Sequence, residues 1–155
     1  MTRILFVCLG NICRSPMAQF VMQELVRREG LEERFEIDSA ATSREEIGNP
    51  PHYGTRNKLA QMGIPMGAHR ARQMTGADYQ KYDLLIGMER WNLKAMQRIA
   101  GGDPDHKMRL LLDYTARKGD IADPWYTGDF DRTFDDIWEG CQALLRHLTN
   151  PRVTE

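Results

Sequence analysis

The segment that most constrains the fold is a short apolar stretch near the start of the chain. Residues 3–8 (RILFVC) are mostly apolar and rich in β-forming side chains, which predicts a buried strand. Gly10 and Asn11 break the pattern directly afterwards, and residues 14–16 (RSP) open a helix that we expect to run to about residue 29. A buried strand, a tight loop and a helix in this order are typical of an α/β sheet protein.

The rest of the chain alternates between the same two kinds of element. Apolar runs predict strands at 35–40, 83–88 and 108–112, and helical patterns predict helices at 49–62, 89–99 and 131–148. With no repeat or linker, we expect one domain over residues 1–155: an α/β fold whose four-stranded parallel sheet is flanked by helices on both faces, of the three-layer Rossmann-like or flavodoxin-like kind. The working site of such folds lies beyond the carboxyl ends of the strands, which is where Cys8 falls.

Composition excludes several classes of function. The 155 residues carry a net charge of −1, with 41% hydrophobic and 28% charged residues. The chain therefore lacks the overall positive charge that is typical of proteins that bind nucleic acid or an anionic membrane surface. The apolar run at 4–9 is too short for a membrane span or a signal peptide, so we expect a cytoplasmic protein. We also expect a monomer.

The chain has three cysteines, Cys8, Cys13 and Cys141, and this odd number argues against a framework of structural disulfides. The scattered histidines lack zinc-ligand spacing, so we expect neither metal nor cofactor.

The loop after the first strand carries the candidate chemistry. Five residues separate Cys8 from Arg14. A tight loop can turn successive N–H groups toward an anion, and Gly10 and Asn11 tolerate the left-handed conformations that this needs. The helix N-terminus adds positive partial charge, and the Arg14 guanidinium matches two phosphate oxygens. This field favours a nucleophilic thiolate at Cys8, to which Ser15 can donate a hydrogen bond. The simpler alternative is that Cys8 is a small buried residue ending a strand.

A second candidate feature is the string Asp123-Pro124-Trp125-Tyr126. Pro124 disfavours a helical conformation at Asp123 and holds its carboxylate in an extended loop. A carboxylic acid in that position can protonate the leaving oxygen of a phosphate ester, and the two aromatic side chains can wall a flat ring. The alternative is a surface turn whose aromatic residues cover the edge of the core.

The strings VCLGNICRSPMAQ, SAATS, EEIGNPP, HRARQ and DPWYTG together resemble the low-molecular-weight protein tyrosine phosphatases, in the expected order over about residues 4–148. The resemblance implies a metal-independent enzyme that acts on phosphotyrosine proteins or peptides and is inhibited by phosphate and vanadate. Cys8 would form a phosphocysteine, Arg14 would bind the phosphate, and Asp123 would act as general acid and then general base. Ser15 would help the thiolate to leave. The implied substrate-binding residues are Leu9, Gly10, Asn11, Ile12, Cys13, Ser15, Trp125 and Tyr126, and the implied loop-bracing residues are Asn11, Ser39 and His69.

Two positions depart from the family pattern. The family often has Met-Asp after the third strand, whereas this chain has Met88-Glu89, and we expect the longer carboxylate to change a contact near the site. The family's Asp-Pro-Tyr-Tyr is Asp-Pro-Trp-Tyr here. Trp125 keeps an aromatic wall but removes a hydroxyl group that could be phosphorylated.

Two other functions fit part of the pattern. An arsenate reductase of the same fold uses a similar loop but needs further cysteines to pass a disulfide along, and none lies between Cys13 and Cys141. A non-catalytic phosphotyrosine-binding module would keep Arg14 but would not need Cys8, Ser15 and Asp123 together. Turnover of an aryl phosphate distinguishes these functions.

The sequence also predicts redox sensitivity. An exposed thiolate at Cys8 would oxidise first to sulfenic acid, and Cys13 lies in the same curled loop. We expect a reversible Cys8–Cys13 disulfide; the alternative is that Cys13 only fills the base of the loop. The remaining sulfur-containing side chains are assigned to packing: Cys141 on the last helix, and Met62, Met66, Met88 and Met96 as core filler.

Overall fold

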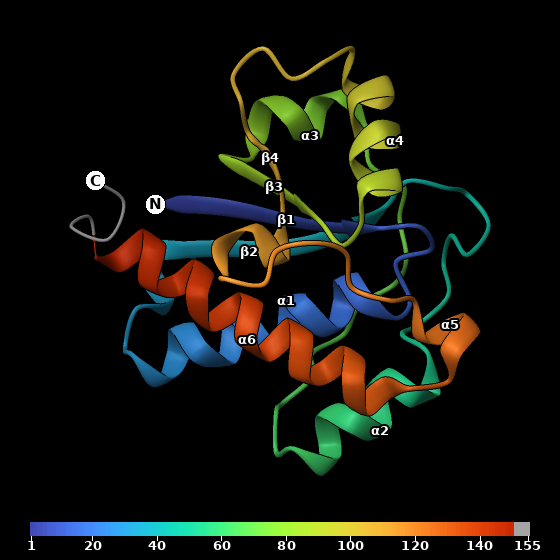
Figure 1. Ribbon diagram of the computed structural model, residues 1–155, viewed down its shortest axis with the longest axis vertical. Coiled ribbons are helices and arrows are strands. Elements are labelled where there is room, and N and C mark those ends of the chain that lie inside the picture. The colour runs from blue at the N-terminus through green and yellow to red at the C-terminus, as the bar shows by residue number, and fades with distance from the viewer. Residues whose placement is uncertain (151–155) are drawn as a thin grey trace.

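The computed structural model describes residues 1–150 and contains one sheet of four parallel strands in the order β2-β1-β3-β4 (Figure 1). The strands are β1 (Thr2–Cys8), β2 (Phe35–Ala41), β3 (Leu84–Gly87) and β4 (Met108–Leu110). β1 lies between β2 and β3, so both of its edges are paired, and helices cover both faces of the sheet, which explains its unbroken apolar sequence. The predicted α/β fold with a four-stranded parallel sheet is therefore confirmed.

Helices cover both faces of the sheet. In Figure 1, α3 (Gly76–Lys81) and α4 (Arg90–Ala100) lie on one side, and α1 (Arg14–Arg28), α2 (Tyr53–Gln61) and α6 (Phe130–Thr149) lie on the other. The short helix α5 (Pro124–Thr127) and two 3-10 turns, η1 (Glu32–Arg34) and η2 (Leu111–Tyr114), complete the fold. Within residues 1–150, no helix combines the length and apolarity that crossing a membrane requires.

Alternating side chains of β1 divide the core into two clusters. Ile4 and Phe6 belong to a buried cluster with residues of α1 and α6, whereas Leu5 and Val7 belong to a second cluster with residues of α3 and α4. This period of two is the geometry of a strand buried on both faces. It fixes β1 rigidly and so fixes the position of Cys8 at its carboxyl end.

Several sequence-based boundaries and assignments differ from the structure. The helix predicted at 49–62 begins at Tyr53, because the His52 ring accepts a hydrogen bond from the Gly54 N–H and acts as its N-cap. Helix α3 was not predicted, since it has only six residues and depends on a capping box between Thr75 and Asp78. Met88 and Met96 are buried as predicted and so is Cys141, but Met62 and Met66 are exposed, so the core assignment of these two was wrong.

Candidate active site

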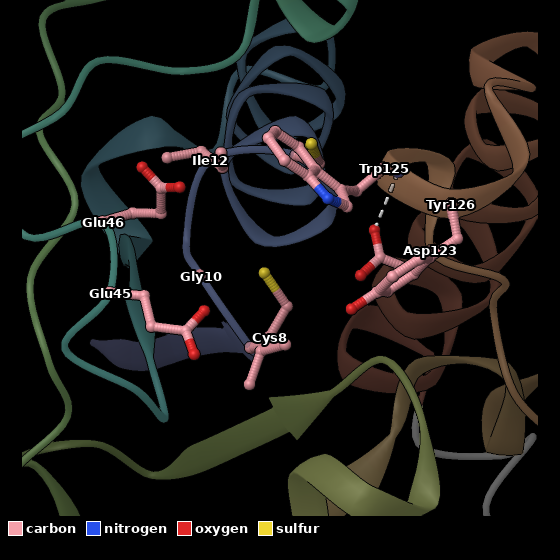
Figure 2. A pocket seen from close by; sticks show the side chains of 10 residues that line it. Cys8, Gly10, Ile12, Glu45, Glu46, Asp123, Trp125 and Tyr126 are labelled. Atoms are coloured by element: carbon pink, nitrogen blue, oxygen red, sulfur yellow. Dashed lines mark hydrogen bonds between the residues drawn. The ribbon is translucent and has the colours of Figure 1, made fainter.

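The loop that follows β1 curls around the sulfur atom of Cys8. The backbone N–H groups of Asn11 and Ser15 donate to Sγ over 3.3 and 3.4 Å, and the Ser15 hydroxyl lies 3.0 Å from it. Figure 2 shows the Cys8 side chain pointing into the pocket. Donors that converge on one sulfur stabilise negative charge there, and the start of α1 at Arg14 adds the positive end of a helix.

The left-handed conformation expected in this loop falls on one residue. Asn11 has φ 59°, as its tolerance for this region allows, whereas Gly10 is not in the positive-φ range. Gly10 instead lies next to the loop that holds Glu46, whose Cγ would be 3.4 Å from a Cβ built at Gly10. The expectation that Gly10 supplies positive φ was therefore wrong.

A buried hydrogen-bond network holds Asn11 in this conformation. Its Nδ2 donates to Ser15 Oγ over 2.7 Å and to Ser39 Oγ over 3.0 Å, and its Oδ1 lies 2.9 Å from His69 Nε2. The structure thus brings together the residues that the resemblance grouped as bracing residues. Ser39 in turn donates to Gln19 over 2.6 Å, a contact that the sequence pattern did not indicate.

The surroundings of His69 favour the neutral form of its imidazole ring. Burial lowers its pKa, since the charged form would lose hydration; the nearby Asp38 opposes this effect and Arg72 adds to it. Asn11 Oδ1 can only accept a hydrogen bond, so the proton of the neutral ring belongs on Nε2. The neutral ring therefore contributes a fixed donor to the loop.

The Arg14 side chain is buried beneath the loop, with 1% of its area exposed. Its Nη1 donates to the Ile121 carbonyl over 2.8 Å, and its Nη2 donates to Glu89 over 3.2 Å and to Asp123 over 3.3 Å. Burial lowers the pKa of Arg14, but the negative charges of Cys8, Asp123 and Glu89 outweigh burial and raise the pKa overall. The guanidinium is therefore a permanent positive charge at the floor of the site.

One donor of this guanidinium has no partner. Arg14 Nε is buried and makes no hydrogen bond with any atom of residues 1–150. A buried N–H without an acceptor costs on the order of 1–3 kcal/mol, so such groups are rare outside functional sites. An anion bound in the loop would supply the missing acceptor.

Glu89, the first departure from the family pattern, contacts the site directly through Arg14. The Asn92 side chain accepts hydrogen bonds from the backbone N–H groups of Met88 and Glu89, both over 3.0 Å, and so fixes the turn between β3 and α4. Glu89 thereby reaches Arg14 from outside the loop. Sequence patterns gave no sign of the role of Asn92.

Asp123 lies on the opposite side of the pocket from the cysteine loop. Its backbone is extended, as predicted, and its carboxylate accepts hydrogen bonds from the Trp125 N–H over 3.0 Å and from Arg14. The short helix after it was not predicted; Pro124 occupies its first turn, where the fixed φ of proline suits a helix start. Trp125 and Tyr126 project at the mouth with 56% and 77% of their areas exposed.

The pocket itself is small, with a cavity volume of about 110 Å³. Cys8 lies at its floor, Asp123, Trp125 and Tyr126 lie on one side, and Glu45 and Glu46 lie on the other (Figure 2). Leu9, Gly10, Ile12 and Cys13 complete the lining. The structure therefore brings the predicted substrate-binding residues around one cavity, except that Asn11 and Ser15 do not line it, although their backbone N–H groups donate to the Cys8 sulfur. The two glutamates were missed, because an acidic pair in a surface loop has no distinguishing sequence pattern.

No metal site was found in the part of the chain that the structure describes. Among residues 1–150, no three His, Cys, Asp or Glu side chains gather as a ligand set. The cysteines are all unpaired buried thiols.

Comparison with known proteins agrees with this geometry. The family model for the low molecular weight phosphotyrosine protein phosphatases matches residues 3–153. The low molecular weight protein-tyrosine-phosphatase YfkJ of Bacillus subtilis is 40% identical over 96% of both chains, and the human low molecular weight phosphotyrosine protein phosphatase is 41% identical over 92% of this chain and 90% of its own.

Solved structures show the same relationship. The crystal structure of YfkJ superposes with a TM-score of 0.94 at 38% identity, covering 98% of this chain and 97% of that one. Wzb of Vibrio vulnificus, solved in complex with benzylphosphonate, superposes with a TM-score of 0.83 at 29% identity, covering 94% and 98%. The family match over nearly the whole chain coincides with a cysteine loop and an opposed aspartate in one pocket, and with a buried arginine that contacts this aspartate. The chain therefore belongs to the low molecular weight phosphotyrosine protein phosphatase family.

Proposed function

We propose that this protein hydrolyses phosphotyrosine and other aryl phosphate monoesters without a metal, through a phosphocysteine intermediate. The observation that carries the proposal is the buried Arg14 guanidinium, whose Nε has no partner among residues 1–150, at the end of a loop whose N–H groups converge on Cys8. Only an anion with several acceptor oxygens satisfies such a set of donors, and a phosphate ester presents one.

In the first step, Cys8 Sγ attacks the phosphorus atom as a thiolate and the ester oxygen leaves with a proton from Asp123. In the free site Arg14 Nη2 is shared between Glu89 and Asp123. An incoming phosphate competes for this N–H, so its binding would release one Asp123 oxygen to carry the proton. Loop N–H groups and Arg14 stabilise the charge of the transition state.

In the second step, Asp123 removes a proton from water, which attacks the phosphocysteine and releases inorganic phosphate. The departing thiolate is stabilised by Ser15, whose hydroxyl lies 3.0 Å from Sγ. Phosphate and vanadate would inhibit by occupying the same donors.

The aromatic mouth supports phosphotyrosine as substrate. A cavity of about 110 Å³ accepts a single side chain, and Trp125 and Tyr126 stand beside it. The benzylphosphonate bound by Wzb also joins an aromatic ring to a phosphorus-containing anion. A phosphoserine is too short to carry its phosphate past the aromatic side chains to the loop.

The decisive experiment compares phosphotyrosine and phosphoserine forms of one peptide, with para-nitrophenyl phosphate as reference, in EDTA. We expect hydrolysis of the aryl substrates, unaffected by EDTA, and a much lower kcat/KM on phosphoserine. Equal rates on both peptides, or inactivation by EDTA, would contradict the proposal. Because the proposed activity needs no partner chain or secretion, we expect a cytoplasmic monomer, which gel filtration and cell fractionation test.

The two other functions that fit the sequence are less well supported. An arsenate reductase would need a further cysteine beyond Cys8 and Cys13 to pass the disulfide along, yet the third cysteine, Cys141, is buried in the core, where its thiol lies 3.8 Å from the Ala18 carbonyl. Arsenate-dependent oxidation of a thiol reductant tests that function. A non-catalytic phosphotyrosine-binding module would bind the peptide without releasing phosphate.

A further inference from the structure

A second cavity opens beside the catalytic pocket, along the exposed face of α4. Its volume is about 510 Å³, compared with about 110 Å³ for the catalytic pocket. Leu9, Asp123 and Tyr126 line both cavities, so the second cavity is continuous with the mouth of the first. We name it the α4 groove.

The outer wall of the α4 groove comes from one helix face. Trp91, Ala95 and Arg98 are spaced by four and three residues, so they lie above one another on α4. Trp91 exposes 72% of its area, which is high for the largest apolar side chain. Single exposed apolar residues are common, but an exposed Trp beside a cavity of ligand size is typical of a recognition surface.

The charged side chains near the catalytic pocket are distributed unevenly. Arg98 lies on the groove wall and forms no ion pair with any of residues 1–150, whereas Glu45 and Glu46 lie on the opposite side of the catalytic pocket. Figure 2 shows these two glutamates facing Asp123 and Tyr126 across Cys8. Glu89 and Asp123 also line the α4 groove, at its end next to the catalytic pocket. An acidic side chain is therefore repelled close to the phosphotyrosine on both sides and attracted only further along the groove, at Arg98.

We propose that the α4 groove binds the substrate chain next to its phosphotyrosine, with an aromatic or large aliphatic side chain against Trp91 and an acidic side chain beyond it at Arg98. The proposal rests on the phosphotyrosine activity proposed above. A catalytic cavity of about 110 Å³ accommodates one side chain only, so the rest of a bound peptide lies outside it, and on one side of the phosphotyrosine it can pass over the edge formed by Leu9 and Tyr126. The groove lies directly beyond that edge.

The test is a set of phosphotyrosine peptides in which each position within four residues of the phosphotyrosine is varied among Gly, Phe, Lys and Glu. For wild type we expect one side of the peptide to prefer Phe close to the phosphotyrosine and Glu further out. Trp91→Ala should reduce kcat/KM for the preferred peptide by roughly tenfold, the size of effect found for a buried interface Trp. Arg98→Glu should change the preference from Glu to Lys at the outer position.

Controls separate the groove from the chemistry and from the fold. Gln97→Ala changes an exposed residue of the same helix that does not line the groove, and it should keep the wild-type peptide preference. Activity on para-nitrophenyl phosphate should not change in Trp91→Ala or Arg98→Glu, because this substrate has no peptide chain to fill the groove.

Each other outcome has a definite meaning. Unchanged peptide preference in both variants, with normal turnover of para-nitrophenyl phosphate, would overturn the groove proposal and leave the proposed function intact. Inactivity of wild type on all phosphotyrosine substrates would overturn both proposals. If sedimentation shows that wild type is a dimer and Trp91→Ala a monomer, the groove binds a second copy of this chain and the peptide proposal is wrong.

Discussion

The cysteine loop, residues 8–15, and the rim of the pocket, Asp123–Tyr126 with Glu45 and Glu46, are built in opposite ways. In the loop, Asn11, Arg14 and Ser15 are buried, and their side chains are held by contacts with one another, with β2 and with a distant loop. At the rim, Trp125 and Tyr126 are more than half exposed. The core therefore fixes the loop groups proposed for phosphate chemistry in advance, whereas the exposed rim side chains proposed for recognition can be replaced with little effect on the fold.

The sharpest way to test the loop is Cys8→Ser, which should abolish turnover. A serine hydroxyl at neutral pH is not ionised and the loop holds no base for it, so we expect kcat to fall by at least about 10⁴-fold. Burst kinetics on para-nitrophenyl phosphate measure the loss.

The same variant should retain phosphate or vanadate binding, because the N–H donors and Arg14 are unchanged. Isothermal titration with vanadate provides this control. Substantial remaining turnover would show that another nucleophile acts.

Asp123→Ala tests the part of the rim that is proposed to act in the chemistry. General acid catalysis contributes on the order of 10²–10⁴-fold, and phenyl phosphate needs the proton more than para-nitrophenyl phosphate does. We therefore expect a larger loss of kcat on phenyl phosphate, measured by phosphate release. Equal losses on the two substrates would mean that Asp123 only holds Arg14 and the Trp125 N–H in place.

Substitutions of Asn11 test whether the buried hydrogen-bond network fixes the conformation of the loop. Asn11→Ala leaves buried partners unsatisfied and places a non-glycine residue at φ 59°, so we expect a loss of about 2–4 kcal/mol in the free energy of unfolding. Asn11→Gly removes the same hydrogen bonds without the steric cost, so it should lose about 1–2 kcal/mol less. Urea denaturation measures both values; identical stabilities would show that the backbone conformation is not strained.

Trp125→Ala is the corresponding test at the rim. Because the side chain is largely exposed, the free energy of unfolding should change by less than about 0.5 kcal/mol. The KM for aryl phosphates should rise roughly 2- to 10-fold, as expected for one lost aromatic contact. A large loss of stability would show that Trp125, whose ring meets His52 edge-on at 5.6 Å, supports α5 rather than the substrate.

The sequence predicted those parts of the molecule that local pattern controls. Strand β1, the alternation of strands and helices, and the placement of Cys8 and Arg14 around one loop follow from an apolar run, a break and a helix start. Residues that act through contacts distant in the sequence, such as Gln19 on Ser39 or Asn92 behind Glu89, leave no local pattern. Met62 is a second example of a feature that local sequence does not determine. An apolar residue at the end of a helix does not reveal whether another part of the chain covers it.

The smallest effect we expect concerns Cys13, which is buried in the loop but unpaired in the structure. Peroxide would oxidise a Cys8 thiolate to sulfenic acid, and attack by the Cys13 sulfur would then form the disulfide and expel hydroxide. Burial raises the pKa of Cys13 to about 12, and the negative charge of Cys8 contributes to this rise. A neutral sulfenic acid removes the contribution of Cys8 but not that of burial, so Cys13 is a slow resolving thiol near neutral pH.

This slowness leads to a defined pH dependence. The thiolate fraction of Cys13 rises about tenfold per pH unit below its pKa. As the pH rises from 6.5 to 8.5, a growing share of the Cys8 sulfenic acid should therefore form the disulfide before dimedone traps it. At pH 8.5, dithiothreitol should restore roughly twice as much activity to peroxide-treated wild type as to Cys13→Ser, because the variant proceeds to sulfinic acid. Mass spectrometry of the peptide that holds both cysteines should show the loss of two hydrogen atoms. Equal recovery at every pH, or a disulfide that includes Cys141, would show that Cys13 only packs the base of the loop.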